Sequence, residues 1–223
     1  MSLIIMALKF NKTIISPNQI ILSVIKSTSK KIGLFFGTFN PIHIGHLIIA
    51  NYMVEFSDLE EVWFVVTPHN PHKKKKTLLE DHHRLAMAEM AVEDYPKLKA
   101  SNVEFALSQP NYTVNTLAYL EEKYPINNFC LIMGEDNLKS LHKWKNHEVI
   151  LDRYSIYVYP RISEGTEETQ FDNHKKIKKV DAPIIELSST FIRNGVKKGK
   201  NIRPMLSPEV WRYLDEMNFY KKS

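Results

Sequence analysis

The chain is poor in cysteine. Its one cysteine, Cys130, excludes an internal disulfide and provides no spacing of the kind that binds zinc. Such sparse use of cysteine is typical of a reducing compartment, so we expect a cytoplasmic protein. No apolar run reaches the length of a membrane span, and no basic stretch followed by an apolar core and a small-residue cleavage site marks a signal peptide. We therefore expect no membrane partner.

Several motifs of common enzyme classes are also missing. There is no Gly-x-Gly-x-x-Gly and no Gly-x4-Gly-Lys-Ser/Thr, which argues against a dinucleotide dehydrogenase and a P-loop kinase. No Ser-His-Asp arrangement and no cluster of metal-ligating residues stands out, so we expect no metal held by the protein itself.

The excess of positive charge is small, with 30 Lys and Arg residues against 25 Asp and Glu residues. A chain of this charge is able to bind nucleic acid or a small polyanion such as ATP. The basic residues are scattered or lie on expected loops, and no helix-turn-helix or RNA-recognition signature is present. We therefore expect no nucleic-acid partner. A basic nucleic-acid-binding protein stays as the alternative function, from a class other than enzymes.

What is present describes an ordinary folded domain. The chain has 223 residues, of which 43% are hydrophobic and 25% are charged, enough to bury one full core. Residues 1–30 contain apolar patches broken by polar residues, and we interpret them as an N-terminal appendage. Residues 31–220 are expected to form a single domain. The role of the appendage, and whether the true start lies downstream at Met6 or beyond, stay open.

Apolar, β-prone runs alternate with helical patterns along this domain. We expect strands over Lys31–Phe36, Glu61–Thr67, Asn102–Leu107, Asn128–Met133, Tyr154–Tyr159 and Ala182–Leu187. We expect helices over Leu47–Phe56, over Leu79–Val92, from Thr113 to about Lys123, and after Ser188 and Ser207. The polar stretch from Arg161 to Lys179 is expected to be a surface loop. The order strand, helix, strand predicts a parallel sheet, and hence an α/β fold.

The most informative stretch is residues 37–46, GTFNPIHIGH, which lies between the first strand and the first helix. Ligands bind at such strand-to-helix turns in α/β sheets. Gly37 allows the backbone to approach a ligand closely. His43 and His46 are three residues apart and therefore share one face of the first helical turn. Because a helix N-terminus already attracts anions, two imidazoles at this position favour a phosphate group.

A second anion site is indicated by residues 188–193, SSTFIR, which follow the last expected strand. Ser and Thr are natural N-cap residues, so the simplest interpretation is a capped helix. Arg193 lies one turn into that helix, on the side of the cap, and an Arg side chain binds phosphate with a fork of donors. Two phosphate sites on separate loops fit a triphosphate better than a single phosphate.

These motifs resemble those of the nucleotidyltransferases with a His-x-Gly-His motif, which transfer a nucleotidyl group from ATP or CTP to an acceptor. Residues 71–73 match the Pro-His-Lys motif of that family, and residues 83–87 match its His-Arg-Leu-x-Met element. Residues 112–117, YTVNTL, resemble the Tyr-Thr-x-Asp-Thr-Leu element of the bacterial nicotinate-nucleotide adenylyltransferases, with Asn115 in place of the Asp. The resemblance covers residues 31 to 220.

The resemblance implies a Rossmann-like open parallel sheet with helices on both faces. It also implies transfer of AMP from ATP to nicotinate mononucleotide, with Mg²⁺ bound by the phosphates and pyrophosphate released. Nicotinamide mononucleotide and phosphopantetheine stay open as acceptors, and a homo-oligomer stays open as well. The residues implied in catalysis are His43, His46, Lys73 and Arg193. Those implied in ATP binding are Gly37, Thr38, Phe39, His43, His46, Gly134, Asp136, Ser189, Thr190 and Arg193. Those implied in acceptor binding are Asn40, Lys73, Thr113, Trp144 and Lys145.

Some of these residues have a structural alternative. Thr113 and Asp136 each stand where they could cap a helix. Trp144 is either a core anchor or a flat surface on which a pyridine ring stacks. Asn40 replaces the Asp that is common in the family, so its role there is the least defined by resemblance.

Overall fold

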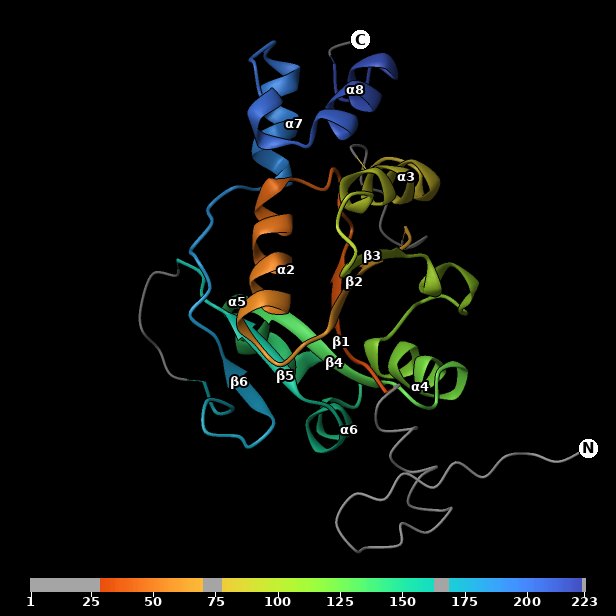
Figure 1. The fold of residues 1–223 in the computed structure, drawn as a ribbon, viewed down its shortest axis with the longest axis vertical. Coiled ribbons are helices and arrows are strands. Elements are labelled where there is room, and N and C mark those ends of the chain that lie inside the picture. The colour runs from red at the N-terminus through yellow and green to blue at the C-terminus, as the bar shows by residue number, and fades with distance from the viewer. Residues whose placement is uncertain (1–28, 70–77, 163–168, 222–223) are drawn as a thin grey trace, which may run out of the picture.

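The computed structural model describes residues 29–69, 78–162 and 169–221. These residues form one sheet of six parallel strands in the order β3-β2-β1-β4-β5-β6 (Figure 1). The strands are β1 Lys31–Gly37, β2 Glu61–Val66, β3 Leu98–Ser101, β4 Asn128–Gly134, β5 Ile156–Tyr159 and β6 Ile177–Lys179. The expected α/β, Rossmann-like architecture is confirmed. Lys73 and nearly all of the expected appendage lie outside the described residues.

Helices cover both faces of the sheet. They are α2 Ile44–Phe56, α3 Asp81–Val92, α4 Thr113–Lys123, α5 Glu135–Ser140, α6 His147–Arg153, α7 Ser189–Lys197 and α8 Pro208–Glu216, with single turns of 3₁₀-helix at η1 Val103–Ala106, η2 Leu141–Lys143 and η3 Arg203–Met205. Within the described ranges, no helix has both the length and the apolar character needed to span a bilayer.

Side chains of the four inner strands alternate between two hydrophobic cores, as a sheet buried on both faces requires. On β1, Phe35 packs into the core that α2, α3, α7 and α8 cover. Its neighbour Leu34 packs into the core that α4, α5 and α6 cover. Because both faces are buried, these strands read as continuous apolar runs, and this is why most of them were predictable from the sequence.

The order of the strands reverses at β1, which pairs with β2 on one side and with β4 on the other. The chain that leaves β1 enters α2 on one face, whereas the chain that leaves β4 enters α5 on the opposite face. The two connections therefore diverge and leave a crevice at the carboxyl ends of these strands. In open α/β sheets, this is the position at which ligands bind.

The strand expected over Asn102–Leu107 is wrong. The third strand is Leu98–Ser101, and Val103–Ala106 form the 3₁₀ turn η1. The apolar alternation in this stretch comes from a turn in which Glu104 is buried and accepts a hydrogen bond of 2.8 Å from the hydroxyl of Thr116. A contact between an edge connection and a later helix leaves no local signal in the sequence.

The last strand was also misplaced. Ala182–Leu187 is not a strand, and β6 is Ile177–Lys179, within the stretch expected to be a loop. β6 is a short edge strand with few apolar residues, so it lacks the hydrophobic pattern of a buried strand. The segment after it crosses the end of the sheet, and Ile185 and Leu187 line a cavity there instead of pairing with a strand.

The ends of β1 and β2 are fixed to α3 by one buried side chain, Arg84. Its Nη1 donates to the carbonyl groups of Thr38, at 2.6 Å, and Thr67, at 2.8 Å. Its Nε donates to the carbonyl of Leu79 at 3.0 Å, and its Nη2 pairs with the carboxylate of Asp81. The side chain is fully buried, and it supplies donors to all three carbonyl groups, whereas Asp81 also accepts the N–H of His69 at 2.9 Å.

We expect Arg84→Met to destabilise the protein by about 3–5 kcal/mol, because it removes a fully buried charge that bonds to three carbonyl groups and to the carboxylate of Asp81. Urea unfolding followed by circular dichroism measures the change. The matched control is Arg153→Met, which removes an exposed ion pair with Glu121 and is expected to cost less than about 1 kcal/mol. Equal losses in the two variants would contradict the assigned role of Arg84.

Candidate active site

The first part of the site is the start of α2. His43 is the N-cap residue of this helix and His46 lies in its first turn, and their rings stack with centroids 3.7 Å apart. The Nδ1 atom of His46 accepts a hydrogen bond of 3.2 Å from the backbone N–H of His43. A neutral His46 therefore carries its proton on Nε2, where it is available as a donor. The shared face predicted from the spacing is confirmed.

Both imidazoles are held in the neutral form. Burial, and then the positive charge of Arg161, lowers the pKa of His43 to about 4. Burial, and then the neighbouring His43 and Arg161, lowers the pKa of His46 well below its ordinary value. At neutral pH the pair offers hydrogen-bonding groups without positive charge. The Nδ1 atom of His43 is buried and has no hydrogen-bond partner among the described residues.

The two rings face a cavity of about 220 Å³. The N-terminal half of α2 forms one wall, and the segment that leads into α7 forms another. Polar groups of the His pair, Arg161 and the start of α7 meet apolar side chains of α2 and of the same segment, so the cavity suits a ligand that is part anionic and part apolar. The lining residues are Phe35, His43, Gly45, His46, Ile49, Tyr159, Arg161, Ile185, Leu187, Ser188 and Ser189.

The second part of the site is the start of α7. Ser188 is the N-cap residue, and its hydroxyl accepts a hydrogen bond of 3.2 Å from the N–H of Phe191. The hydroxyl of Ser189 donates to the carbonyl of Pro41 at 2.8 Å. Arg193 donates to the carbonyl of Asn40 at 2.8 Å and to the hydroxyl oxygen of Thr190 at 3.1 Å. The two motifs that the sequence singled out therefore touch each other.

The residues just before His43 shape the loop. Gly37, Thr38 and Phe39 do not line the cavity. Phe39 is buried at a positive φ of 44°, and its ring packs edge-on against His46 with centroids 5.1 Å apart. The Oδ1 atom of Asn40 accepts hydrogen bonds from the N–H of Leu79 and from the hydroxyl of Tyr220.

Arg161 was missed in the sequence because it opens the stretch expected to be a loop. It lies just beyond β5, and its Nη2 donates to the hydroxyl of Tyr159 at 3.3 Å. Its Nε lies 3.9 Å from Asp136 Oδ1, and this buried nitrogen makes no hydrogen bond within the described part of the chain. Its place after a strand, at the edge where the motifs gather, was the one signal for it.

The two residues predicted after β4 lie beside Arg161. Gly134 ends the strand, and Asp136 lies in the first turn of α5 without capping it. A Cβ atom at position 134 would collide with Asp136 Oδ1 and would lie 3.1 Å from Arg161 Cγ. Glycine is therefore needed here for the close approach of Asp136 and Arg161 to the strand end.

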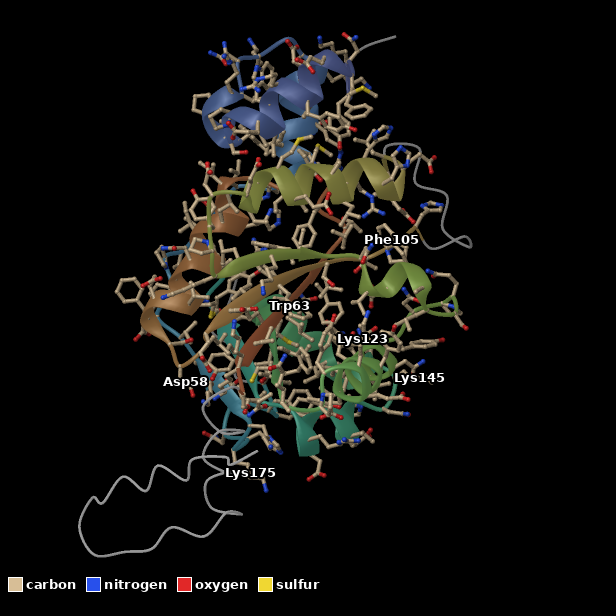
Figure 2. All side chains as sticks on the ribbon, turned by 45° about the vertical axis from the view of Figure 1, so that its right-hand side comes forward. Asp58, Trp63, Phe105, Lys123, Lys145 and Lys175 are labelled. Atoms are coloured by element: carbon tan, nitrogen blue, oxygen red, sulfur yellow. The ribbon has the colours of Figure 1, made fainter. Side chains whose placement is uncertain are left out.

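A second cluster joins the residues predicted to bind the acceptor. Thr113 is the first residue of α4, and the N-cap residue is Tyr112. The ammonium group of Lys145 lies 4.2 Å from the ring centroid of Tyr112, which brings the segment after η2 to the start of α4 (Figure 2). Trp144 is half-buried and packs against the core under this cluster, so one part of its surface stays accessible. A cation over an aromatic ring is a favourable pair.

Glu104 is a buried carboxyl group that the sequence did not reveal. Its side chain is 2% exposed, and its Oε1 accepts the hydroxyl of Thr116 in α4. Burial raises the pKa of Glu104 above its ordinary value. The backbone carbonyl of Glu104 accepts a hydrogen bond of 2.9 Å from Asn111. Through Asn111 and Thr116, Glu104 thus holds the chain on both sides of Tyr112 and Thr113.

Comparison with known proteins agrees with this architecture. Residues 34–195 match the model of the family described as cytidylyltransferase-like. A protein of Christiangramia forsetii is 67% identical over 86% of this chain and 100% of its own length, and one of Flavobacterium psychrophilum is 66% identical over the same shares. Both are named probable nicotinate-nucleotide adenylyltransferase.

The solved structure of the Plasmodium falciparum nicotinic acid mononucleotide adenylyltransferase complexed with NaAD has the same fold, with a TM-score of 0.70 and 20% identity over 86% of this chain and 97% of that one. The fold is thus that of a cytidylyltransferase-like nucleotidyltransferase. Within this class, the chain belongs to the nicotinate-nucleotide adenylyltransferase family.

The lowered pKa of His43 predicts a loss of stability in acid. The folded pKa of about 4 lies below the ordinary value of 6.5, so the unfolded chain binds more protons between these values. Stability from this group is present above pH 6.5 and is lost as the pH falls toward 4, by about 3 kcal/mol in all. Urea unfolding at a series of pH values tests this.

The control is His43→Asn, which cannot titrate in this range and keeps a residue suited to an N-cap. We expect the free energy of unfolding of this variant to fall less steeply than that of the wild type between pH 7 and pH 4. Parallel curves for the two proteins would show that His43 is not held neutral in the folded state.

Proposed function

We propose that this chain transfers the AMP moiety of ATP to nicotinate mononucleotide, giving nicotinate adenine dinucleotide and pyrophosphate. The observation that carries the proposal is the single cavity in which the stacked His43 and His46, Arg161 and the start of α7 meet. The 67% identity to a full-length relative named for this activity supports the choice of acceptor. We assign the activity to residues 31–220 and treat residues 1–30 as an appendage.

ATP is placed with its phosphates between the starts of α2 and α7. Unpaired N–H groups and the positive end of a helix favour an anion at both positions. Ser189 and Thr190 lie at the start of α7, and Gly134 and Asp136 lie at the end of β4, where the ribose would bind. Two apolar side chains of the cavity wall, Ile49 and Ile185, suit the adenine ring.

The reaction requires alignment and stabilisation of charge, with no covalent intermediate. A phosphate oxygen of the acceptor attacks the α-phosphorus of ATP in line with the leaving group. The bond from the α-phosphorus to the bridging oxygen breaks, and its electron pair leaves with pyrophosphate. Negative charge therefore grows on the β-phosphate side, where a preorganised donor lowers the barrier.

His43 and His46 are the donors we assign to this charge. Because both imidazoles are neutral, they donate through N–H without the desolvation cost of a buried cation. The Nε2–H of His46 is the donor that its bond to the His43 backbone leaves free. Positive charge comes from Arg161, from Arg193, and from Lys73, which lies outside the described residues and is kept on the resemblance alone.

The donor set around the cavity is imidazole, hydroxyl and guanidinium, which suits phosphate oxygens better than a metal ion. Among the described residues, no group of three or more His, Cys, Asp and Glu side chains could hold a metal. We therefore assign any Mg²⁺ to the oxygens of the triphosphate, where it would screen their charge.

The buried free thiol of Cys130 is in keeping with a reaction in the cytoplasm.

The acceptor is assigned to the cluster of Tyr112, Thr113, Trp144 and Lys145, with Asn40 at the edge of the loop that carries His43. The first turn of α4 offers backbone N–H groups to the nicotinate carboxylate. The accessible part of Trp144 offers a surface on which the pyridine ring can stack. The ammonium group of Lys145, held over Tyr112, adds a positive charge that favours an acid over an amide.

The first experiment compares pyrophosphate release with ATP, Mg²⁺ and each of three acceptors, which are nicotinate mononucleotide, nicotinamide mononucleotide and phosphopantetheine. We expect the nicotinate to be strongly preferred. In Lys145→Met, we expect the ratio of kcat/KM for the acid to that for the amide to fall roughly tenfold, because one charge-assisted contact is lost.

Thr113→Ala is the companion variant, and it should also reduce turnover of the acid more than turnover of the amide. Lys123→Met is the control for a general effect of charge, since Lys123 is the last residue of α4 and Thr113 is the first. If the wild type prefers another acceptor, the assignment of the acceptor site is rejected and the assignment of the ATP site is retained. Salt-dependent binding of DNA without turnover of ATP would favour the nucleic-acid alternative.

We expect His46→Ala to lower kcat by about 10²–10³-fold, because a donor to the developing charge is lost. The KM for ATP should change much less, since several other groups bind the ground state. The variant must give the same far-UV circular dichroism spectrum and a cooperative unfolding transition. A folded His46→Ala protein with near-normal turnover would remove His46 from the mechanism.

A further inference from the structure

The segment that follows α8 returns to the loop that carries His43. The hydroxyl of Tyr220 donates a hydrogen bond of 2.6 Å to Asn40 Oδ1, across 180 positions of the sequence. The same oxygen accepts the N–H of Leu79 at 3.2 Å. Asn40 is 4% exposed, so these bonds form away from water, where they are strongest. Figure 1 shows α8 beside α3, at the end of the molecule where α7 also lies.

The backbone after α8 is arranged to deliver this hydroxyl. Asn218 adopts a left-handed φ of 55°, and the N–H groups of Asn218 and Phe219 donate to the carbonyls of Asp215 and Leu214. This is a Schellman motif, which ends the helix and reverses the chain. The ring of Phe219 then packs 4.7 Å from that of His83, centroid to centroid.

Tyr220 itself has a left-handed φ of 61°. This conformation is disfavoured for a bulky residue and persists where the surroundings hold it. Burial raises the pKa of Tyr220 above its ordinary value, against the opposing charges of Arg193 and Arg84. The phenol therefore keeps its proton at neutral pH and remains a donor to Asn40.

We propose that Tyr220 is a positioning residue for nucleotidyl transfer, which fixes the loop carrying His43 through its hydrogen bond to the side chain of Asn40. The proposal rests on the proposed function. Asn40 lies three residues before His43, and its backbone carbonyl is held by Arg193 at the same time. The Tyr220 bond and the Arg193 bond thus fix the side chain and the backbone of one loop residue from two different directions.

The expected consequence is selective for the reaction step. The cavity walls and the start of α7 that bind ATP do not include Tyr220. Loss of its hydroxyl therefore leaves ground-state binding largely unchanged. Alignment of the imidazoles with the reacting phosphates is more sensitive, because a displacement near 1 Å is able to cost on the order of 10²-fold in rate.

The test is Tyr220→Phe, which removes one oxygen and keeps the ring. We expect kcat for AMP transfer to fall roughly tenfold or more, with the KM for ATP within about twofold of the wild type. The matched control is Tyr213→Phe. It removes a hydroxyl from the nearby helix α8, and this hydroxyl lies 2.8 Å from His83 Nδ1. We expect this control to keep wild-type kcat.

A second readout is the titration of His43 measured by NMR of the imidazole in the absence of substrate. If Tyr220 positions the loop, Tyr220→Phe exposes the imidazole of His43 and raises the pKa of His43 from about 4 toward its ordinary value. Tyr213→Phe leaves the pKa of His43 unchanged. The proposal is overturned if both kcat and the His43 titration in Tyr220→Phe match the wild type, or if the two variants lose activity equally.

This design separates the two proposals. An inactive wild-type protein, tested with all three acceptors, would reject the proposed function, and the titration would still test the position of the loop. An active wild type with an equally active Tyr220→Phe and an unchanged titration would reject only the role of Tyr220.

Discussion

The position of the histidine pair depends on hydrogen bonds to the carbonyl groups of the loop before it. A strand-to-helix loop at the end of a buried sheet has backbone acceptors that no strand or helix satisfies, and leaving them unpaired is costly. Here Arg84 satisfies Thr38, Arg193 satisfies Asn40, and Ser189 satisfies Pro41. The same residues therefore complete the fold and hold the loop that carries the histidine pair.

The electrostatics of the site follow from this construction. Once the loop is fixed, the ring centroids of the two imidazoles lie 3.7 Å apart. Both rings are shielded from solvent and lie close to Arg161. Two protonated rings at that distance would repel each other, and burial already disfavours the charged form. In the proposed function, attraction for an anion is thus left to the helix N-termini and to the guanidinium groups. The imidazoles are assigned as neutral donors, whose contribution depends on position rather than on charge.

Local pattern was enough for the elements that are buried on both faces, and it failed where partners are distant. The runs around β1, β2 and β4 are continuously apolar and were placed correctly. The short edge strand β6 has little apolar character, and the turn around Glu104 is stabilised by Thr116 from the next helix. In the same way, motif spacing identified His43, His46 and the start of α7. It could not identify Arg161 or Tyr220, whose significance comes only from what they touch in the folded chain.

The sequence separation of the loop contacts has a consequence for the nascent chain. Asn40 leaves the ribosome 180 positions before Tyr220, an interval of roughly 10–40 s at about 5–20 residues per second. During that time β1, α2 and β2 are able to assemble and Arg84 is able to bond to the carbonyl of Thr38, whereas the carbonyl groups of Asn40 and Pro41 wait for Arg193 and Ser189. The central sheet is therefore synthesised well before the contacts that fix the loop are complete, and the last of them, from Tyr220, forms only after α8 has emerged.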